Sequence, residues 1–417
     1  MSRDRIETYR IYLYLLFLAG ALFGLVISPP VLSIGLIGIV VLGLLDPLKG
    51  LNPKWRAEIG EWIKSPLPLA LIALYVLLLL GGWQTEDWPY YLERLRIKIP
   101  LLSLPLIWPG LPTLDRKTGN LIFGGFALFL GVVLLGVFVN YGFHFAEINE
   151  LISQGRPMPV PRNHIRFSLL VAMGTFFAYY AGQRKALGYQ KRWWGLAGFL
   201  FVGLHLLAVR SGLAGAYAGV GVLILAEGWR RGTWWPAAVA IAGLILLPIV
   251  AYVAVPSFRT KMDYVRYELL HRDVNVDQHE YSDEGRMTSI RIGWDIFLDH
   301  PQLGIGPGNL LQETDRRYTN IGLGPKGKRP HNQFVSALAG SGLLGGIITL
   351  GSFLVLARIG FRRRDPAYLA IWTVFFLSCL VENTLENTVG VSAFALILLL
   401  VGTREPPATN EQPDAHS

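Results

Sequence analysis

The sequence predicts an all-α polytopic membrane protein with about twelve transmembrane helices and one large, partly helical loop outside the bilayer. Its 417 residues are 52% hydrophobic and only 16% charged, whereas about a quarter of the residues of a soluble protein are charged. The apolar residues stand in blocks of roughly 17 to 25, the length that crosses about 30 Å of hydrocarbon. A membrane β-barrel is excluded, because its strands alternate apolar and polar residues.

Twelve apolar blocks give the expected spans in chain order. The fourth is the weakest, because its four prolines, Pro100, Pro105, Pro109 and Pro112, favour a kinked or partly re-entrant helix over a straight span. The blocks lie at residues 11–28, 31–48, 66–83, 97–112, 120–141, 165–182, 193–210, 212–229, 235–255, 333–358, 367–383 and 389–402.

Lysine and arginine gather in every second loop between these blocks, which predicts that both chain ends lie in the cytoplasm. The net charge of +9 is therefore assigned to topology and to contacts with anionic membrane lipids, and no nucleic-acid partner is expected. The chain divides into spans 1–9 (residues 1–255), a long outer loop (256–332), spans 10–12 (333–402) and a polar tail (403–417) that we expect to be disordered in the cytoplasm.

The residue types and motifs that the sequence lacks exclude several kinds of chemistry. Cys379 is the single cysteine, so neither an intrachain disulfide nor a cysteine–histidine metal cluster can form. The sequence has no nucleotide-binding glycine fingerprint and no compact group of acids, so neither a cofactor nor a metal is expected. The spans hold almost no charge at mid-depth, with Glu382 and Glu386 near an outer end, which argues against a transport path.

The outer loop concentrates arginine on two expected amphipathic helices, 256–272 and 286–298. Arg266 lies on the first helix, and Arg286 and Arg291 lie on the second. Each arginine alone could be a solvated charge or half of a surface ion pair. Their number in one loop above a membrane favours the binding of an anion.

Two tight turns are further candidates for anion binding. Arg210 stands between two expected spans, ahead of Ser211 and Gly212, which permit close backbone approach. This arginine either snorkels to the lipid head groups or clamps an anion. The glycine-rich residues 300–309 form either a plain turn or a nest of amides that converge on an anion.

His331 is the candidate general base. It follows Pro330 and precedes Asn332, which can cap the next helix, so the imidazole is expected at a helix N-terminus beside the membrane. The positive end of the helix dipole keeps such an imidazole neutral and able to accept a proton. The alternative is an interfacial histidine without a task. His164 and Asn309 are possible supporting residues.

These residues resemble the O-antigen ligase family, within a superfamily that also includes O-antigen polymerases and some protein O-oligosaccharyltransferases. His331-Asn332, followed after nine residues by Gly342-Leu343-Leu344-Gly345, resembles the ligase pattern H-[NSQ]-x9-G-x2-[GTY]. Residues 300–309 look like the glycine–proline run of the superfamily, and Arg286 stands where the family has a loop arginine. Arg210-Ser211-Gly212 resembles a further family element, from which Val209 departs.

The resemblance implies transfer of a polysaccharide from undecaprenyl diphosphate to a sugar hydroxyl of lipid A–core oligosaccharide. It places the reaction at the periplasmic face of the bacterial inner membrane, in an enzyme similar to GT-C glycosyltransferases. We expect arginines, in place of a metal, to stabilise the leaving diphosphate, and a single displacement to invert the anomeric centre. The expected site has His331 as the base, Arg210, Arg286, Arg291 and Arg266 at the diphosphate, and Asn332, His164 and Asn309 in support.

Three alternatives stay open at this point. An O-antigen polymerase and a protein O-oligosaccharyltransferase would use the same donor and differ in the acceptor. A transporter of lipid-linked oligosaccharide is the alternative from another class. The sequence leaves undecided the donor sugar, the position on the acceptor, the oligomeric state and the groove that holds the lipid tail.

Overall fold

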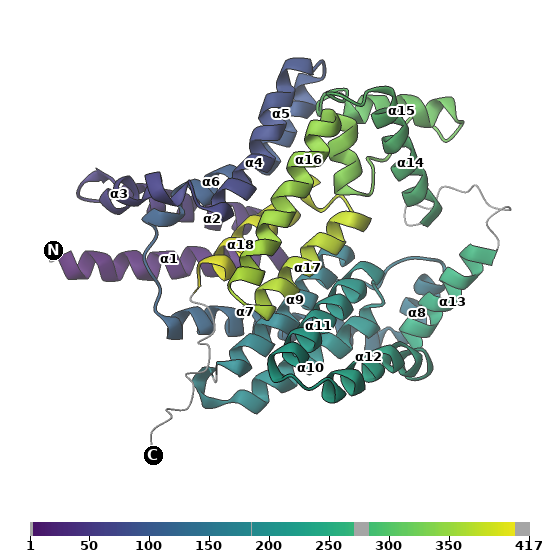
Figure 1. The fold of residues 1–417 in the computed structure, drawn as a ribbon. Coiled ribbons are helices and arrows are strands. Elements are labelled where there is room, and N and C mark those ends of the chain that lie inside the picture. The colour runs from purple at the N-terminus through teal and green to yellow at the C-terminus, as the bar shows by residue number, and fades with distance from the viewer. Residues whose placement is uncertain (1–2, 185, 271–282, 405–417) are drawn as a thin grey trace.

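The computed structural model describes residues 3–184, 186–270 and 283–404, and it is a bundle of packed helices (Figure 1). Nearly all of the tail expected at 403–417 lies outside the described residues. In Figure 1, α8 (Phe145–Ser153) and α13 (Pro256–Leu270) lie side by side at the edge of the bundle opposite α1 (Arg3–Val26). The all-α prediction is confirmed for the described residues, whose few strand residues form one short pair.

Among the described residues, seven helices are long and apolar enough to cross a membrane, which supports the prediction of a multi-pass membrane protein. Three further apolar helices have 16 residues each, and the expected total of about twelve spans stays a prediction. The seven are α1, α4 (Pro66–Leu80) with the 3-10 turn η1 (Gly81–Gln84), α7 (Arg116–Phe143), α9 (His164–Gln183), α11 (Arg210–Arg231), α12 (Trp235–Ala254) and α16 (Gln333–Arg362). The three shorter ones are α2 (Pro29–Leu44), α17 (Pro366–Val381) and α18 (Thr388–Thr403).

The remaining elements are amphipathic or short. Both helices expected in the outer loop are present, as α13 and α14, while α5, α8 and α15 were not expected from the sequence. These elements are α3 (Pro53–Trp62), α5 (Trp88–Lys98), α6 (Pro100–Ile107), α8, α10 (Gln190–Leu207), α13, α14 (Asp283–Asp299), α15 (Leu310–Asn320), the 3-10 turns η2 (Trp108–Gly110), η3 (Ala186–Gly188) and η4 (Thr384–Glu386), and the strands β1 (Leu45–Asp46) and β2 (Gly50–Leu51).

The fourth expected span is a broken segment, in line with its kinked or re-entrant alternative. Helix α6 has only eight residues, about 12 Å at 1.5 Å per residue, which is too short to cross the hydrocarbon. Pro109 has no N–H to donate to the carbonyl of Pro105 four residues earlier. The indole of Trp62 in α3 donates to that carbonyl instead, at 2.7 Å, so α3 is held beneath the break.

The core lies around α9, whose residues are almost entirely enclosed by α7, α10, α11 and α17. Helix α11 approaches α9 closely where its first turn passes Ser168. A Cβ added to Gly212 would lie 2.5 Å from the Oγ of Ser168, so only glycine fits there. The expected close approach after Arg210 is therefore present, and it anchors the start of α11 against the centre of the bundle.

The glycine-rich residues 300–309 pack against a break in α16. The break falls at Ser341 and Gly342, where Gly342 has a φ of +62°. The amides of Ile305 and Gly306 donate to the carbonyls of Ala339 and Gly340, at 3.1 and 2.9 Å. Because α16 occupies these two amides, they are not available to an anion, which favours the plain-turn interpretation of the glycine run.

Candidate active site

The first turn of α16 positions His331. The side chain of Asn332 accepts hydrogen bonds from the amides of Phe334 and Val335, at 2.9 and 3.0 Å, which confirms the expected helix cap. The amide of His331 donates to the Oγ of Ser289 in α14, at 3.1 Å. The backbone of His331 is thus held by two helices, and its side chain, about 20% exposed, is half-buried between them.

Glu382 joins His331 to Arg286. This glutamate ends α17 and is only 6% exposed. Its Oε2 lies 3.2 Å from Nδ1 of His331, and its Oε1 lies 2.6 Å from Nη2 of Arg286. Sequence reasoning placed Glu382 near an outer end of a span and gave it no role. The sequence signal that could have identified Glu382 is an acidic residue directly after the apolar block that forms α17.

The electrostatic surroundings keep Glu382 ionised. Burial alone would raise the pKa of this carboxyl, but the hydrogen bond from His331 and the positive charge of Arg286 outweigh that effect, so its pKa lies below the usual value. An ionised carboxylate can only accept hydrogen bonds, so Nδ1 of His331 carries the proton it shares with Glu382. The lone pair of a neutral His331 is then on Nε2, which is the atom able to act as a base.

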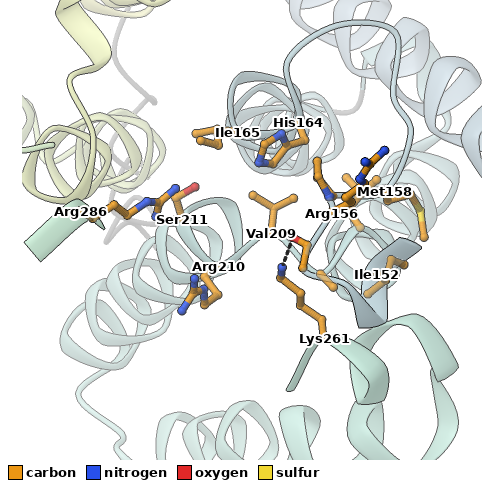
Figure 2. Close-up of a pocket in the computed structure, with 14 residues that line it drawn as sticks. Ile152, Arg156, Met158, His164, Ile165, Val209, Arg210, Ser211, Lys261 and Arg286 are labelled. Atoms are coloured by element: carbon orange, nitrogen blue, oxygen red, sulfur yellow. Dashed lines mark hydrogen bonds between the residues drawn. The ribbon is translucent and has the colours of Figure 1, made fainter. Parts of the chain in front are cut away.

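Arg286 also reaches the wall of a basic pocket, which encloses about 550 Å³ of space that is partly open to solvent. Figure 2 shows Arg286 and Arg210 on one side of Val209, Arg156 and Lys261 on the other, and His164 between the two groups. Among the described residues, the lining contains no Asp or Glu. The described wall of the pocket is therefore basic, and one of its cations, Arg286, is paired with Glu382 outside the lining.

Three of the basic side chains of the pocket are placed by a helix end or by a contact between two segments. Arg210 begins α11 after a turn in which Ala208 takes a left-handed conformation, with a φ of +51°. His164 begins α9, directly after its cap Asn163. Lys261 of α13 donates from Nζ to the carbonyl of Gly155, at 3.0 Å, and so links α13 to the segment after α8.

The structure brings together some of the expected residues and separates others. Arg210, Arg286 and His164 line one pocket, and His331 adjoins it through Glu382 and Arg286 without lining it. Arg156 and Lys261 join the pocket, although the sequence analysis did not place them in the site. They lie far from the motif in sequence, so no local pattern marked them.

Arg266 and Arg291 are exposed and are not part of the pocket lining. Asn309 also lies outside the pocket, and its side chain links the loop to the segment before α5 by hydrogen bonds. Its Nδ2 donates to the carbonyl of Gln84 at 2.8 Å, and its Oδ1 accepts from the amide of Glu86 at 2.8 Å. These contacts are those of a structural residue.

A second cluster of charges lies on the other flank of His331. Glu386, in η4, contacts Nζ of Lys98 at 2.5 Å, Nη1 of Arg329 at 3.4 Å and Nε2 of Gln333 at 3.0 Å. Burial would raise the pKa of Glu386, but the charges of Lys98 and Arg329 outweigh it, so the pKa lies below its usual value. Both carboxylate oxygens are engaged, and the cluster ties α5 to α16.

Two chemical capabilities follow from this arrangement. The cationic pocket can bind an anion with more than one negative charge, and the imidazole beside it can take a proton from a hydroxyl. Among the described residues, no three His, Cys, Asp or Glu side chains are grouped so that they could hold a metal ion.

Comparison with known proteins agrees with the resemblance stated from the sequence. Residues 195–350 match the family model described as O-antigen ligase. The matched stretch contains Arg210, Arg286 and His331. No curated protein matches the chain.

Proposed function

Because residues 195–350 match the O-antigen ligase family model, we propose that this protein transfers a polysaccharide from undecaprenyl diphosphate to a sugar hydroxyl of lipid A–core oligosaccharide. The family match supports the broader statement that the protein is a membrane enzyme of the ligase or polymerase type, which transfers glycan from lipid-linked substrates. The specific donor, the acceptor, the inner membrane and the periplasmic orientation belong to the proposal.

In the proposed reaction, the oxygen of the acceptor hydroxyl attacks the anomeric carbon of the donor sugar. The new glycosidic bond forms as the bond between that carbon and the diphosphate oxygen breaks, so the configuration inverts. The hydroxyl proton passes to Nε2 of His331, and the electron pair of the broken bond leaves on the diphosphate. Each proton and charge has a destination, and neither ATP nor a redox partner is needed.

The diphosphate is the leaving group that the basic pocket would stabilise. Guanidinium groups make paired hydrogen bonds to phosphate oxygens, and Arg210 and Arg286 both line the pocket. Lys261 and Arg156 add charge to the same wall. We propose that these cations do the work that a divalent metal does in many related transferases, so the reaction proceeds without metal.

Glu382 is assigned the task of orienting the base. As an ionised acceptor it fixes the proton of His331 on Nδ1 and leaves Nε2 for the acceptor hydroxyl. It also favours the imidazolium that forms during transfer. The single observation that carries the proposal is this chain of contacts, which connects the candidate base to an arginine of the cationic pocket.

Reconstitution tests the proposal directly. Purified protein in liposomes is supplied with lipid-diphosphate polysaccharide and lipid A–core, and the expected product is polysaccharide attached to the core with inverted anomeric configuration. Activity should be unchanged in excess EDTA. Loss of activity with EDTA and recovery on adding Mg²⁺ would overturn the metal-independent mechanism.

Separate acceptors distinguish the related functions. A ligase elongates lipid A–core, a polymerase joins two lipid-linked glycans when no core is present, and an oligosaccharyltransferase modifies a protein. Transfer in only the second or third reaction would assign the same site to that other acceptor. No transfer in any of the three, combined with movement of lipid-linked glycan across the liposome membrane, would favour the transporter.

A further inference from the structure

A second basic pocket, which we call the far pocket, lies at the end of α9 that is remote from the candidate active site. His164, the first residue of α9, lines the candidate site, and Gln183, the last residue of α9, lines the far pocket. The 20 residues of α9 rise about 30 Å at 1.5 Å per residue, which is the thickness of the hydrocarbon layer. The two pockets therefore lie at opposite surfaces of the membrane.

The far pocket is lined by more cations than acids, and it encloses about 1270 Å³ of space that is partly open to solvent. Its described lining contains three cations, Arg116 and Lys117 in the first turn of α7 and Arg184 directly after α9. The one acid in that lining, Asp115, caps α7 by accepting a hydrogen bond from the amide of Thr118 at 3.3 Å. Among the residues that the structure describes, none of the three cations forms an ion pair with a carboxylate.

Other basic residues near the same membrane surface are paired. Arg230 and Arg231, at the end of α11, both contact Glu227. Arg404, which follows α18, donates to both carboxylate oxygens of Asp365, each at 2.8 Å. The unpaired cations of the far pocket therefore differ from their neighbours, and an anion that enters the pocket would find them available.

Arg184 also has an unused hydrogen-bond donor. Its guanidinium lies over the ring of Tyr180, 5.4 Å from the ring centroid, and its Nη2 is buried with no hydrogen-bond partner among the described residues. A buried donor without an acceptor costs free energy. A phosphate group supplies the oxygen acceptors that suit a guanidinium best. Arg184 therefore favours an anionic oxygen ligand in the far pocket.

The depth of the far pocket suits the phosphate of a lipid head group. Helix α7 has 28 residues, which rise about 42 Å and so exceed the roughly 30 Å of hydrocarbon. Arg116 and Lys117 place the first turn of α7 in the head-group layer, because charged side chains are costly in hydrocarbon. Leu121 lines the pocket one turn after Lys117 and is exposed, so an acyl chain can contact it.

We propose that the far pocket holds the phosphate of an anionic phospholipid, an inference that is independent of the proposed reaction. Basic loops attract anionic lipids in a diffuse way, whereas a pocket with three cations and an unsatisfied guanidinium binds one head group at a fixed place. The bound lipid joins the start of α7 to the end of α9. A zwitterionic lipid fits less well, because its quaternary amine is repelled by the same cations.

Lipid titration followed by native mass spectrometry tests the site. Delipidated wild-type protein in detergent should bind a first phosphatidylglycerol about fivefold more tightly than phosphatidylcholine. Arg184→Gln should weaken the first phosphatidylglycerol about fivefold, the effect of one basic residue near an anionic membrane surface. Lys117→Glu should weaken it further, because it also adds a negative charge. Arg362→Glu makes the same charge change at an exposed arginine that ends α16 outside the pocket, and it should have an effect of less than about twofold.

The control variant separates a defined site from diffuse attraction. Equal weakening by Lys117→Glu and Arg362→Glu would overturn the proposal, as would equal affinity of the wild-type protein for the two phospholipids. Millimolar inorganic phosphate should not displace the bound phosphatidylglycerol. Displacement by inorganic phosphate would overturn the lipid assignment and give the pocket to a free phosphate anion.

Thermal unfolding in detergent provides a second measurement. Saturating phosphatidylglycerol should raise the unfolding temperature of the wild-type protein and of Arg362→Glu by about 3 °C, and it should leave that of Lys117→Glu unchanged. Size-exclusion chromatography without added lipid shows whether each variant is folded. A similar rise in all three proteins would overturn the proposal. Because neither measurement uses glycan transfer, the proposed reaction and this inference can fail separately.

Discussion

Glu382 and Glu386 lie four residues apart after α17, and both are buried carboxylates paired with cations, yet their surroundings differ. Glu386 meets Lys98 and Arg329, and Gln333 completes its hydrogen bonds. Glu382 meets His331 and Arg286, and Arg286 faces a pocket lined by further cations and, among the described residues, by no acid. Among the described residues, the two regions therefore differ in that an acid lies at the centre of one group of cations, whereas the lining of the other contains cations only.

The difference has a physical consequence. A balanced buried cluster holds helices together, because removing one partner leaves an uncompensated charge away from water. A pocket lined by several cations attracts an incoming anion. We therefore assign a structural task to the Glu386 cluster and a chemical task to the Glu382 side. The experiments below are arranged to break or sharpen that division.

The largest effect is expected from the base. His331→Ala should lower the rate of transfer about 10²–10⁴-fold, because the acceptor proton would have no side chain to receive it. The measurement is transfer by purified variant in liposomes, with thermal unfolding to show that the protein stays folded. His300→Ala, at an exposed histidine of the same loop, is the control and should leave the rate unchanged. Wild-type activity in His331→Ala would remove the base assignment.

The next effect is expected from the arginines of the pocket. Arg286→Ala and Arg210→Ala should each lower transfer about 10²–10³-fold, the range seen when one donor to a developing charge is removed. Arg286→Lys should recover only part of this loss, since an ammonium keeps the charge but cannot make the paired contact. Initial rates at saturating donor provide the measurement, and full activity in either alanine variant would take that arginine out of the mechanism.

The same substitution should affect stability at Glu386 and the rate of transfer at Glu382. Glu386→Gln should lower the free energy of unfolding by about 3–5 kcal/mol, because it leaves Lys98 and Arg329 with a neutral partner. Its folded fraction should keep a rate within twofold of wild type. Glu382→Gln should lower the rate by at least tenfold and shift its pH profile, because a neutral amide no longer fixes the tautomer of His331. An equal loss of rate in both variants would contradict the assignment of a structural task to Glu386 and a chemical task to Glu382.

Acid should weaken the Glu386 cluster in a predictable direction. The pKa of Glu386 is depressed in the folded protein, so its stabilising contribution is present above the unfolded value near 4.5 and is lost as the pH falls through the lower folded value. The wild-type unfolding temperature should therefore fall as the pH drops below about 4.5. In Glu386→Gln the fall should be shallower over the same range, and an identical slope would contradict the assignment.

The smallest effect is expected from the exposed arginines of the loop. Arg266 and Arg291 are predicted from the sequence to bind diphosphate, but neither lines the pocket. Their alanine variants should change transfer by less than about threefold, in the range of exposed ion pairs. A loss as large as that of Arg286→Ala would mean that the pocket closes further when the donor binds, and would restore both residues to the site.

The helices of this protein are largely determined by local sequence. Apolar blocks long enough to cross a bilayer have few ways to satisfy their backbone groups other than helix formation, and the expected blocks recur as helices, apart from the proline-broken one that ends at Pro112. The cap Asn332 and the helices that carry Arg266 and Arg286 could also be predicted, because they too depend on residues that are neighbours in the sequence. The amphipathic helices α5, α8 and α15 were missed, because they carry too much charge to stand out beside solid apolar runs.

The sequence alone predicted the membrane class, the candidate His331 through a motif of short spacing, and the candidates Arg286 and Arg210 through separate features. Only the tertiary structure decided which charges meet. Glu382 reaches His331 across 51 positions of the chain, and Lys261 reaches the pocket from another helix. The reason is physical: secondary structure follows from neighbours within a few residues, whereas the balance of charge in a pocket depends on which helix ends the packing brings to one place.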